Sequence, residues 1–89
     1  MLFNKYLVKL LLEIKKKGWI NRKTQTAYTS NIGYYIAISF LKKHNLIECN
    51  GVDNNNMKLW KLTPKGLEIA EKIIDIRRAV GVKNPEVIE

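Results

Sequence analysis

The chain has few of the residues from which metal sites and catalytic centres are commonly built. Its 89 residues include one cysteine, Cys49, and one histidine, His44. A single cysteine excludes an intrachain disulfide and a cysteine-cluster metal site, and one histidine offers no ligand spacing. Carboxylates paired with a histidine and glycine-rich phosphate loops are missing as well. We therefore expect a protein that is not an enzyme, with no catalytic residue, no metal and no cofactor.

Long hydrophobic runs are also missing. The apolar stretch from Tyr6 to Leu12 is interrupted by Lys9, is too short to span a bilayer, and lacks the cleavage site of a signal peptide. We expect no membrane segment and a reducing, cytoplasmic setting. Cys49 is expected to be a small buried side chain, with an intermolecular disulfide as the alternative.

Negative charge is nearly absent from the front half of the chain. Residues 1–43 hold nine Lys and Arg residues against Glu13 alone, whereas residues 44–89 hold seven basic and seven acidic residues. All of the net charge of +8 therefore belongs to the front half. This distribution fits one side that faces a polyanion, and an ordinary solvated basic surface is the alternative.

The front half has the patterning of three helices. A first core helix is predicted over residues 2–17, ending at Gly18. Its apolar residues at helical spacing are Leu2, Phe3, Tyr6, Leu7, Leu10, Leu11 and Ile14. After a short extended link, a second helix is predicted from about Arg22 to Tyr28. A third is predicted from about Ile32 to His44, because Asn45 tolerates the left-handed conformation that ends a helix.

The back half has the patterning of a β-hairpin followed by a long helix. Short strands are predicted over Leu46–Cys49 and Met57–Leu62, and the residues between them are rich in the Asn, Asp and Gly that tight reversals need. Thr63 suits the N-cap of a last helix that begins at Pro64 and ends near Val80. The capping box is incomplete, because Gly occupies position 66. Residues 81–89 form a short tail for which disorder is an open alternative.

The last helix carries two apolar stripes, although a monomer needs one. Leu67, Ala70 and Ile74 form the stripe expected to face the core. The second stripe repeats at i, i+4, i+7 and i+11, and consists of Ile69, Ile73, Ile76 and Val80. A second stripe needs a partner, so we expect a homodimer through residues 64–80. The alternative is that a small domain covers both sides of this helix.

This order of elements is that of a winged helix-turn-helix, a DNA-binding module. The expected fold is α+β, mostly α, with three helices, a β-hairpin wing and a C-terminal helix in one domain over residues 1–80. In such a module the start of the third helix enters the major groove. The candidates for base contact are Ser30, Asn31, Tyr34, Tyr35 and Ser39. The candidates for phosphate contact are Arg22, Lys23, Thr24, Gln25, Lys42 and Lys43, with Asn55 and Lys58 on the wing.

The third helix is unusually apolar for a helix that reads base edges. Tyr34, Ile38 and Leu41 are expected in the core, which leaves Tyr35 and Ile36 unexplained. Either a partner covers this helix, or the helix reads DNA shape and methyl groups more than hydrogen-bond patterns. For Asn31, a structural turn cap is the alternative to base contact.

Three motifs carry a resemblance to a known family. They are Lys23-Thr24, Tyr28-x-x-Asn31-Ile32-Gly33-Tyr34 and Leu62-Thr63-Pro64-Lys65-Gly66. Over roughly residues 7–78 the chain resembles an archaeal winged-helix family. That family includes small crenarchaeal chromatin-type proteins, which dimerise through a C-terminal coiled coil, and regulators of archaea and of their viruses and plasmids.

The resemblance implies binding to double-stranded DNA, homodimerisation and a nucleoid-associated location. The segment after Tyr34 is shorter than in the chromatin-type members, and the last helix ends too early for their long coiled coil. We therefore expect a dimeric transcriptional regulator. A general architectural DNA-binding protein and a winged-helix module for protein–protein interaction are the alternatives.

Overall fold

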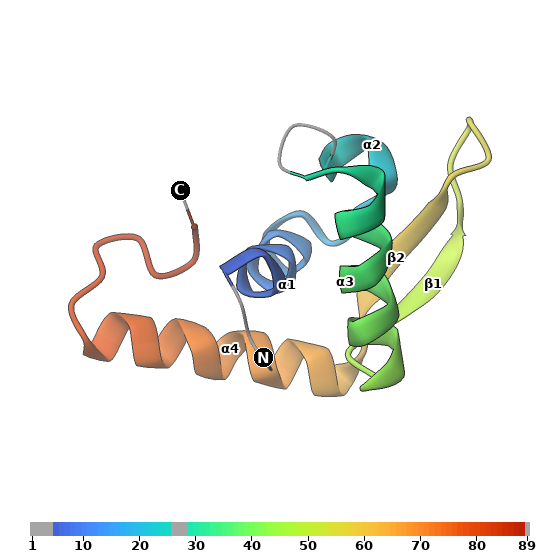
Figure 1. The fold of residues 1–89 in the computed structure, drawn as a ribbon. Helices are drawn as coiled ribbons and strands as arrows, with labels where there is room; N and C mark the ends of the chain where they lie inside the picture. The colour runs from blue at the N-terminus through green and yellow to red at the C-terminus, as the bar shows by residue number, and fades with distance from the viewer. Residues whose placement is uncertain (1–4, 26–28, 89) are drawn as a thin grey trace.

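Four helices and one β-hairpin make up the part of the chain that the computed structural model describes, residues 5–25 and 29–88 (Figure 1). The fold is α+β and mostly helical, with the antiparallel hairpin after three helices. The elements are α1 (Lys5–Lys17), α2 (Arg22–Gln25), α3 (Asn31–Lys43), β1 (Ile47–Val52), β2 (Lys58–Leu62) and α4 (Pro64–Ala79). The expected start of the first helix and the expected end of the second lie in residues 1–4 and 26–28, outside the described residues.

Helix α1 lies at the centre of the molecule, with α4 packed along one side of it and α3 and β2 on another (Figure 1). Its side chains Leu10, Leu11 and Ile14 are fully buried, as their spacing predicts. Ile20, which lies in the link between α1 and α2, is buried too. Its N–H donates to the carbonyl of Trp60 at 3.0 Å, and the Trp60 N–H donates back at 2.9 Å, so the link is tied to β2.

Helix α3 begins and ends as local chemistry dictates. The Ser30 hydroxyl accepts from the N–H of Gly33 at 3.1 Å and caps the helix start. At the other end Asn45 has a φ of 60°, which confirms the predicted left-handed stop. The N–H of Leu46 then donates to the Leu41 carbonyl at 2.9 Å. The core predictions for Tyr34, Ile38 and Leu41 are confirmed by their burial.

The hairpin projects from the body, and its strands pair in the register Ile47 with Leu62 and Cys49 with Trp60. In β1 only Ile47 is buried. The prediction that Cys49 is buried is wrong. The thiol of Cys49 is exposed, because β1 extends past the body of the protein. The strand also continues to Val52, three residues beyond the predicted end.

The end of α3, the base of the hairpin and the start of α4 meet at the carbonyl oxygen of Leu46. This oxygen accepts from the Thr63 N–H at 3.1 Å, and the Thr63 hydroxyl in turn accepts from the N–H of Gly66 at 3.0 Å. A Cβ atom at position 66 would lie 1.9 Å from the same oxygen. Glycine therefore replaces the Glu of a capping box because backbone occupies the space that a side chain would need.

Helix α4 buries the ridge formed by Gly66, Ala70 and Ile74. Leu67 was expected on the core face, but 42% of its surface is exposed. That expectation is wrong. Because Gly66 packs against the backbone at Leu46, the face of α4 that carries Gly66 is buried, and the next residue, Leu67, lies outside that face.

The second stripe of α4 is divided between core and solvent. Ile69 and Ile73 pack partly against the core, whereas 64% of Ile76 and 74% of Val80 are exposed. No described helix is both long enough and apolar enough to cross a membrane.

Residues 81–88 fold back along the body. The Arg77 guanidinium donates to the carbonyls of Pro85 at 3.0 Å and Val87 at 2.9 Å. The Lys9 ammonium donates to the Ile88 carbonyl at 3.0 Å. The side chain of Ile88 also packs against the core.

Candidate nucleic-acid interface

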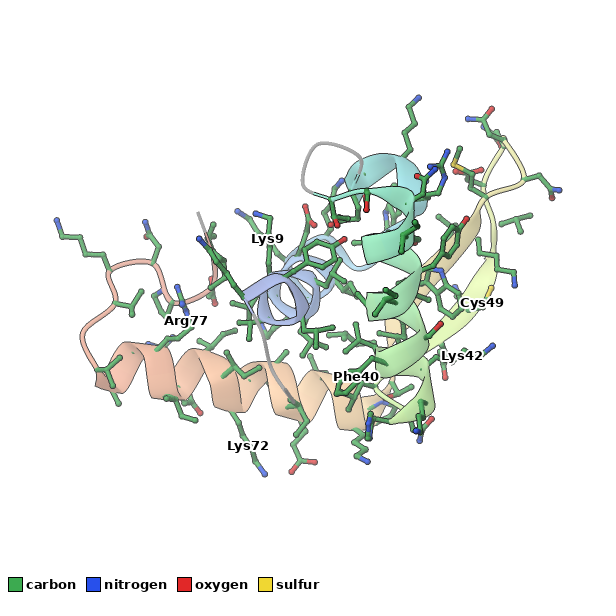
Figure 2. All side chains as sticks on the ribbon, viewed as in Figure 1. Lys9, Phe40, Lys42, Cys49, Lys72 and Arg77 are labelled. Carbon is green, nitrogen blue, oxygen red and sulfur yellow. The ribbon has the colours of Figure 1, made fainter. Side chains whose placement is uncertain are left out.

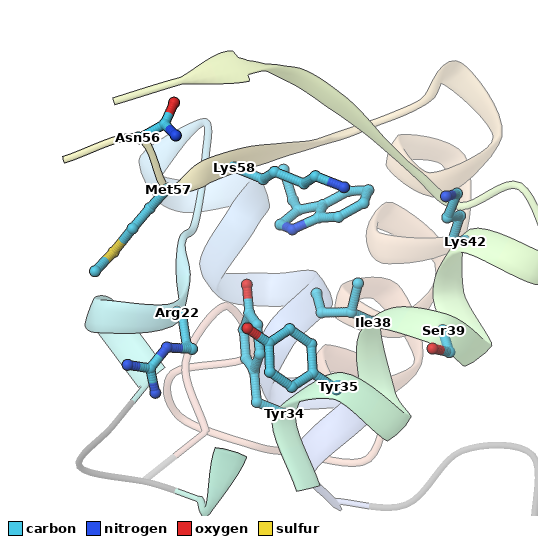
Figure 3. Close-up of a pocket in the computed structure, with 10 residues that line it drawn as sticks. Arg22, Tyr34, Tyr35, Ile38, Ser39, Lys42, Asn56, Met57 and Lys58 are labelled. Carbon is cyan, nitrogen blue, oxygen red and sulfur yellow. The ribbon is translucent and has the colours of Figure 1, made fainter. Parts of the chain in front are cut away.

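A hollow of about 410 Å³ opens between α3 and the hairpin (Figure 3). Three buried side chains lie at its base, namely Tyr34, Ile38 and Trp60. Figure 3 shows Arg22 at one end of this hollow and Lys42 at the other, with Lys58 facing the tyrosines from the hairpin. The hollow therefore has an apolar base and a polar, cationic rim.

The cations of the rim come from three separate elements. Arg22 comes from α2, Lys42 from α3 and Lys58 from β2, and no acidic residue is among the described residues that line the hollow. The Lys42 ammonium lies 6.0 Å from the centre of the Trp60 ring, so its stem covers apolar surface while its charge stays at the rim. Converging cations without a counter-charge create a positive potential suited to an anionic ligand.

The two tyrosines of α3 differ in what they can reach. Tyr34 is 3% exposed, and its ring packs in a T-shaped arrangement against the Tyr35 ring, with ring centres 5.3 Å apart. Burial, with a smaller contribution from Tyr35, raises the pKa of Tyr34 to about 12, although Arg22 and a hydrogen bond with Trp60 oppose the shift. The predicted base contact of Tyr34 is therefore corrected to a core role. Tyr35 is 56% exposed and lines the hollow.

Gln25 is another predicted contact that the structure removes from the surface. Its side chain is 1% exposed, and it donates to the Glu13 carboxylate at 2.5 Å and accepts from the Tyr6 hydroxyl at 3.2 Å. Burial, followed by Tyr34 and Glu13, raises the pKa of Tyr6 well above its usual value, so this phenol stays protonated and donates. Gln25 thus fixes α2 to α1 and cannot contact a phosphate.

The hydroxyl of Thr24 is also engaged within the protein. It donates to the Asn21 carbonyl at 2.8 Å, and the Thr24 N–H donates to the Asn21 side-chain oxygen at 3.0 Å. Asn21 therefore caps α2, a role that the polar composition of residues 21–24 did not reveal.

Ser30 and Asn31 are exposed at the start of α3, in roles that differ from the expected ones. Ser30 caps the helix, so the alternative that Asn31 is the cap is wrong. The Asn31 side-chain oxygen instead accepts a hydrogen bond from the Arg22 guanidinium. Asn31 therefore holds Arg22 at the edge of the hollow.

Asp53 organises the hairpin tip, whereas the sequence pattern predicts only a turn position for it. One carboxylate oxygen accepts from the N–H groups of Asn55 at 2.8 Å and Met57 at 2.9 Å, and the other accepts from the Asn21 amide at 2.8 Å. The hydrogen bond from Met57, followed by those from Asn55 and Asn21, lowers the pKa of Asp53. This carboxylate thus connects the tip to the start of α2.

A stripe of exposed side chains runs along α3 beside the hollow. It consists of Ile32, Tyr35, Ile36 and Ser39, and we call it the α3 stripe. Ile32 is 74% exposed and Ile36 65%. The sequence singled out Tyr35 and Ile36 but missed Ile32, although its spacing of four residues from Ile36 places it on the same face.

The structure brings together part of the predicted set. Arg22, Tyr35, Ser39, Lys42 and Lys58 line the hollow. Lys23, Lys43 and Asn55 are exposed around it without lining it. Among residues 5–25 and 29–88, no group of three or more His, Cys, Asp or Glu side chains is placed to hold a metal ion.

Comparison with known proteins returned no match to a protein-family model, to a curated protein or to a solved structure. The geometry and charge of the described residues are therefore the basis for a functional assignment.

Proposed function

We propose that this protein binds double-stranded DNA as a winged helix-turn-helix and acts as a dimeric transcriptional regulator. One observation carries the proposal: cations from α2, α3 and β2 converge on a hollow whose described lining residues include no carboxylate. A phosphate backbone is the polyanion that such an arrangement fits, since it presents negative charges at regular spacing along a surface.

The arrangement of the elements supports the same function. Three helices precede a hairpin that stands beside α3, and a fourth helix follows it (Figure 1). With the hairpin as the wing, α3 is the helix available to a major groove about 12 Å wide. Its first turns are exposed on the side of the hollow, so a duplex placed there would contact α3, Arg22 and Lys58 together.

A salt series measured by gel shift tests this proposal. The logarithm of the duplex affinity should fall linearly with the logarithm of the salt concentration, with a slope of about 0.9 per phosphate neutralised. Each of the variants Arg22→Ala, Lys42→Ala and Lys58→Ala should lower that slope by about one and weaken binding on all sequences alike.

The matched control is Lys83→Ala, which removes the same charge from an exposed residue beyond the C-terminal end of α4. It should leave the slope unchanged. Absence of duplex binding at low ionic strength, or binding that is insensitive to salt, would contradict the proposal.

Phosphate contacts give affinity, and only base contacts or DNA deformability give discrimination. Selection of bound sequences from random duplexes separates a regulator from a general DNA organiser. An enriched palindromic motif supports the regulator, and no enrichment supports the architectural role.

One observation favours a second candidate function, a module for protein–protein interaction. The α3 stripe exposes an aromatic and two aliphatic side chains, which are typical anchors of protein interfaces. The variant Tyr35→Ala separates the two functions. Loss of a protein partner with unchanged duplex affinity supports the second, whereas loss of duplex affinity in a folded protein supports the first.

A further inference from the structure

The α3 stripe exposes aliphatic surface beside the hollow that we assign to DNA. Ile32 and Ile36 lie one turn apart, 74% and 65% exposed, and contribute no group that can hydrogen-bond a base or a phosphate. Phosphate binding therefore does not account for them.

Charge around the stripe points to an anionic occupant. Neither α2 nor α3 contains an acidic residue. Lys42 and Lys43 lie in the last turn of α3, and Arg22 lies beside its first turn, held by Asn31. An apolar protein surface would gain little from these cations, whereas a DNA groove is bordered on both sides by phosphates.

Within the major groove, the thymine C5-methyl is the one apolar group on the edges of the base pairs. Guanine and adenine are commonly recognised by Arg, Lys, Asn or Gln side chains, and residues 32–41 contain none of these. Only the hydroxyls of Tyr35 and Ser39 add polarity to the stripe. The side-chain oxygen of Asn31 is engaged by Arg22, and Lys42 and Lys43 lie in the last turn of α3. Aliphatic contact with methyl groups is thus the direct readout that the α3 stripe itself has the chemistry to perform.

We propose that Ile32 and Ile36 contact C5-methyl groups of pyrimidines in the major groove, so that the protein prefers thymine-containing duplexes. This proposal rests on the duplex binding proposed above. The feature of the duplex that the site recognises is then the methyl group, and the contact is apolar and not a hydrogen bond.

The test replaces thymine by uracil in a short duplex of A·T pairs, which removes the methyl groups and keeps the hydrogen-bonding edges of both grooves. Each lost methyl contact should weaken binding about threefold to fourfold, and loss of two contacts about tenfold. Conversely, 5-methylcytosine in place of cytosine in a G·C duplex should strengthen binding, because it places a methyl group at the same ring position.

The double variant Ile32→Ala with Ile36→Ala should bind the thymine and uracil duplexes equally while keeping the salt slope of the unmodified protein. Both side chains are exposed, so thermal unfolding should change little. The matched control is Leu67→Ala, which removes an exposed aliphatic side chain from α4 and should keep the preference for thymine.

The outcomes distinguish this proposal from the proposed function. Equal affinity for the thymine and uracil duplexes, with steep salt dependence, overturns methyl recognition and leaves DNA binding in place. A preference for thymine that persists in the double variant also overturns it. No binding to any duplex at low salt overturns both proposals, and a defined protein complex that the double variant then loses would assign the stripe to a protein interface.

Discussion

Helices α3 and α4 each expose aliphatic side chains to solvent, but the charges around them differ. Ile36 on α3 and Ile76 on α4 are exposed almost equally, at 65% and 64%. α3 contains only basic charged residues, whereas α4 contains three acidic and four basic ones, and Glu68 and Lys72 pair at 3.2 Å. The exposed aliphatic side chains of α3 therefore lie among basic residues alone, whereas those of α4 lie among residues of both charges.

The difference is consistent with the two partners proposed above, duplex DNA and a second copy of the chain. Basic residues without counter-charges favour a polyanion, so the surface of α3 suits DNA. The acidic and basic residues of α4 are nearly equal in number, so two copies of this surface would not strongly repel each other. The surface of α4 therefore suits a second copy of this chain. Each surface can be changed without touching the core, which makes the comparison testable.

The largest effect is expected from reversing two charges beside α3. The double variant Lys42→Glu with Lys58→Glu places carboxylates where the phosphates would lie, and duplex affinity should fall on the order of a hundredfold or more at about 0.1 M salt, where the Debye length is about 10 Å. Gel shift at constant ionic strength measures the change.

The matched control is Lys72→Glu with Lys83→Glu, which alters net charge by the same amount. Figure 2 shows Lys72 pointing from α4 to solvent on the side away from α1. These charges are screened from the α3 surface, so affinity should fall only a few-fold. An equal loss in both double variants would mean that binding follows net charge and not the hollow.

An effect of roughly tenfold is expected from Ile76→Asp on α4. A charge in the exposed part of the second stripe should convert a dimer into a monomer, as measured by sedimentation. Duplex affinity should then fall by about tenfold or more, because two linked subunits no longer act on one DNA molecule.

The counterpart is Ile36→Asp on α3, at an equally exposed position. It should weaken DNA binding and leave the sedimentation of the protein unchanged. A wild-type protein that already sediments as a monomer at micromolar concentration would show that Ile76 and Val80 form no dimer interface.

The smallest effect is expected at Asp53. The variant Asp53→Ala should weaken duplex binding about threefold, although it removes a negative charge, because the hairpin tip loses its connection to α2. Asp53→Asn is the matched control. It removes the same charge and keeps an oxygen that can accept from the N–H groups of Asn55 and Met57, but it offers no second acceptor to the Asn21 amide, so it should weaken binding as much as Asp53→Ala if the connection to α2 is the cause.

The stabilising contacts of the Asp53 carboxylate should depend on pH in a definite direction. Since the pKa of Asp53 is lowered from 3.8, its stabilising contacts are fully present above that value and are lost as pH falls through the lower, folded-state pKa.

If both Asp53 variants bind DNA more tightly than the wild-type protein, the removed negative charge has a larger effect on binding than the position of the hairpin tip.

The local chemistry of the elements was predictable, and their tertiary contacts were less so. Thr63, Pro64 and Asn45 act at helix ends as their chemistry predicts, because capping depends on neighbouring backbone. The burial of Gln25 and the exposure of Leu67 depend on contacts with distant elements, which residue spacing within one helix does not report.

In the candidate site, too, features that depend on local sequence were predictable, whereas those that depend on contacts with distant elements were not. Arg22, Lys42 and Lys58 were predicted from their charge and their places in the expected order of elements, and they line the hollow, whereas Lys23 and Lys43 do not. The role of Asp53 was missed because its partner Asn21 is 32 residues away. The exposure of Ile32 depends on how α3 is rotated against the core, which the burial of Tyr34 and Ile38 fixes.

The contact between Gly66 and the Leu46 carbonyl has a consequence for how a dimer would meet DNA. Backbone lies close against backbone there, which restricts how the start of α4 can move relative to the segment that leaves α3. In a dimer formed through α4, the two α3 helices would hold a fixed separation and a fixed angle about the duplex axis. Cooperative binding would then depend on the rotational phase of the two half-sites, recurring with each helical turn of about 10.5 base pairs.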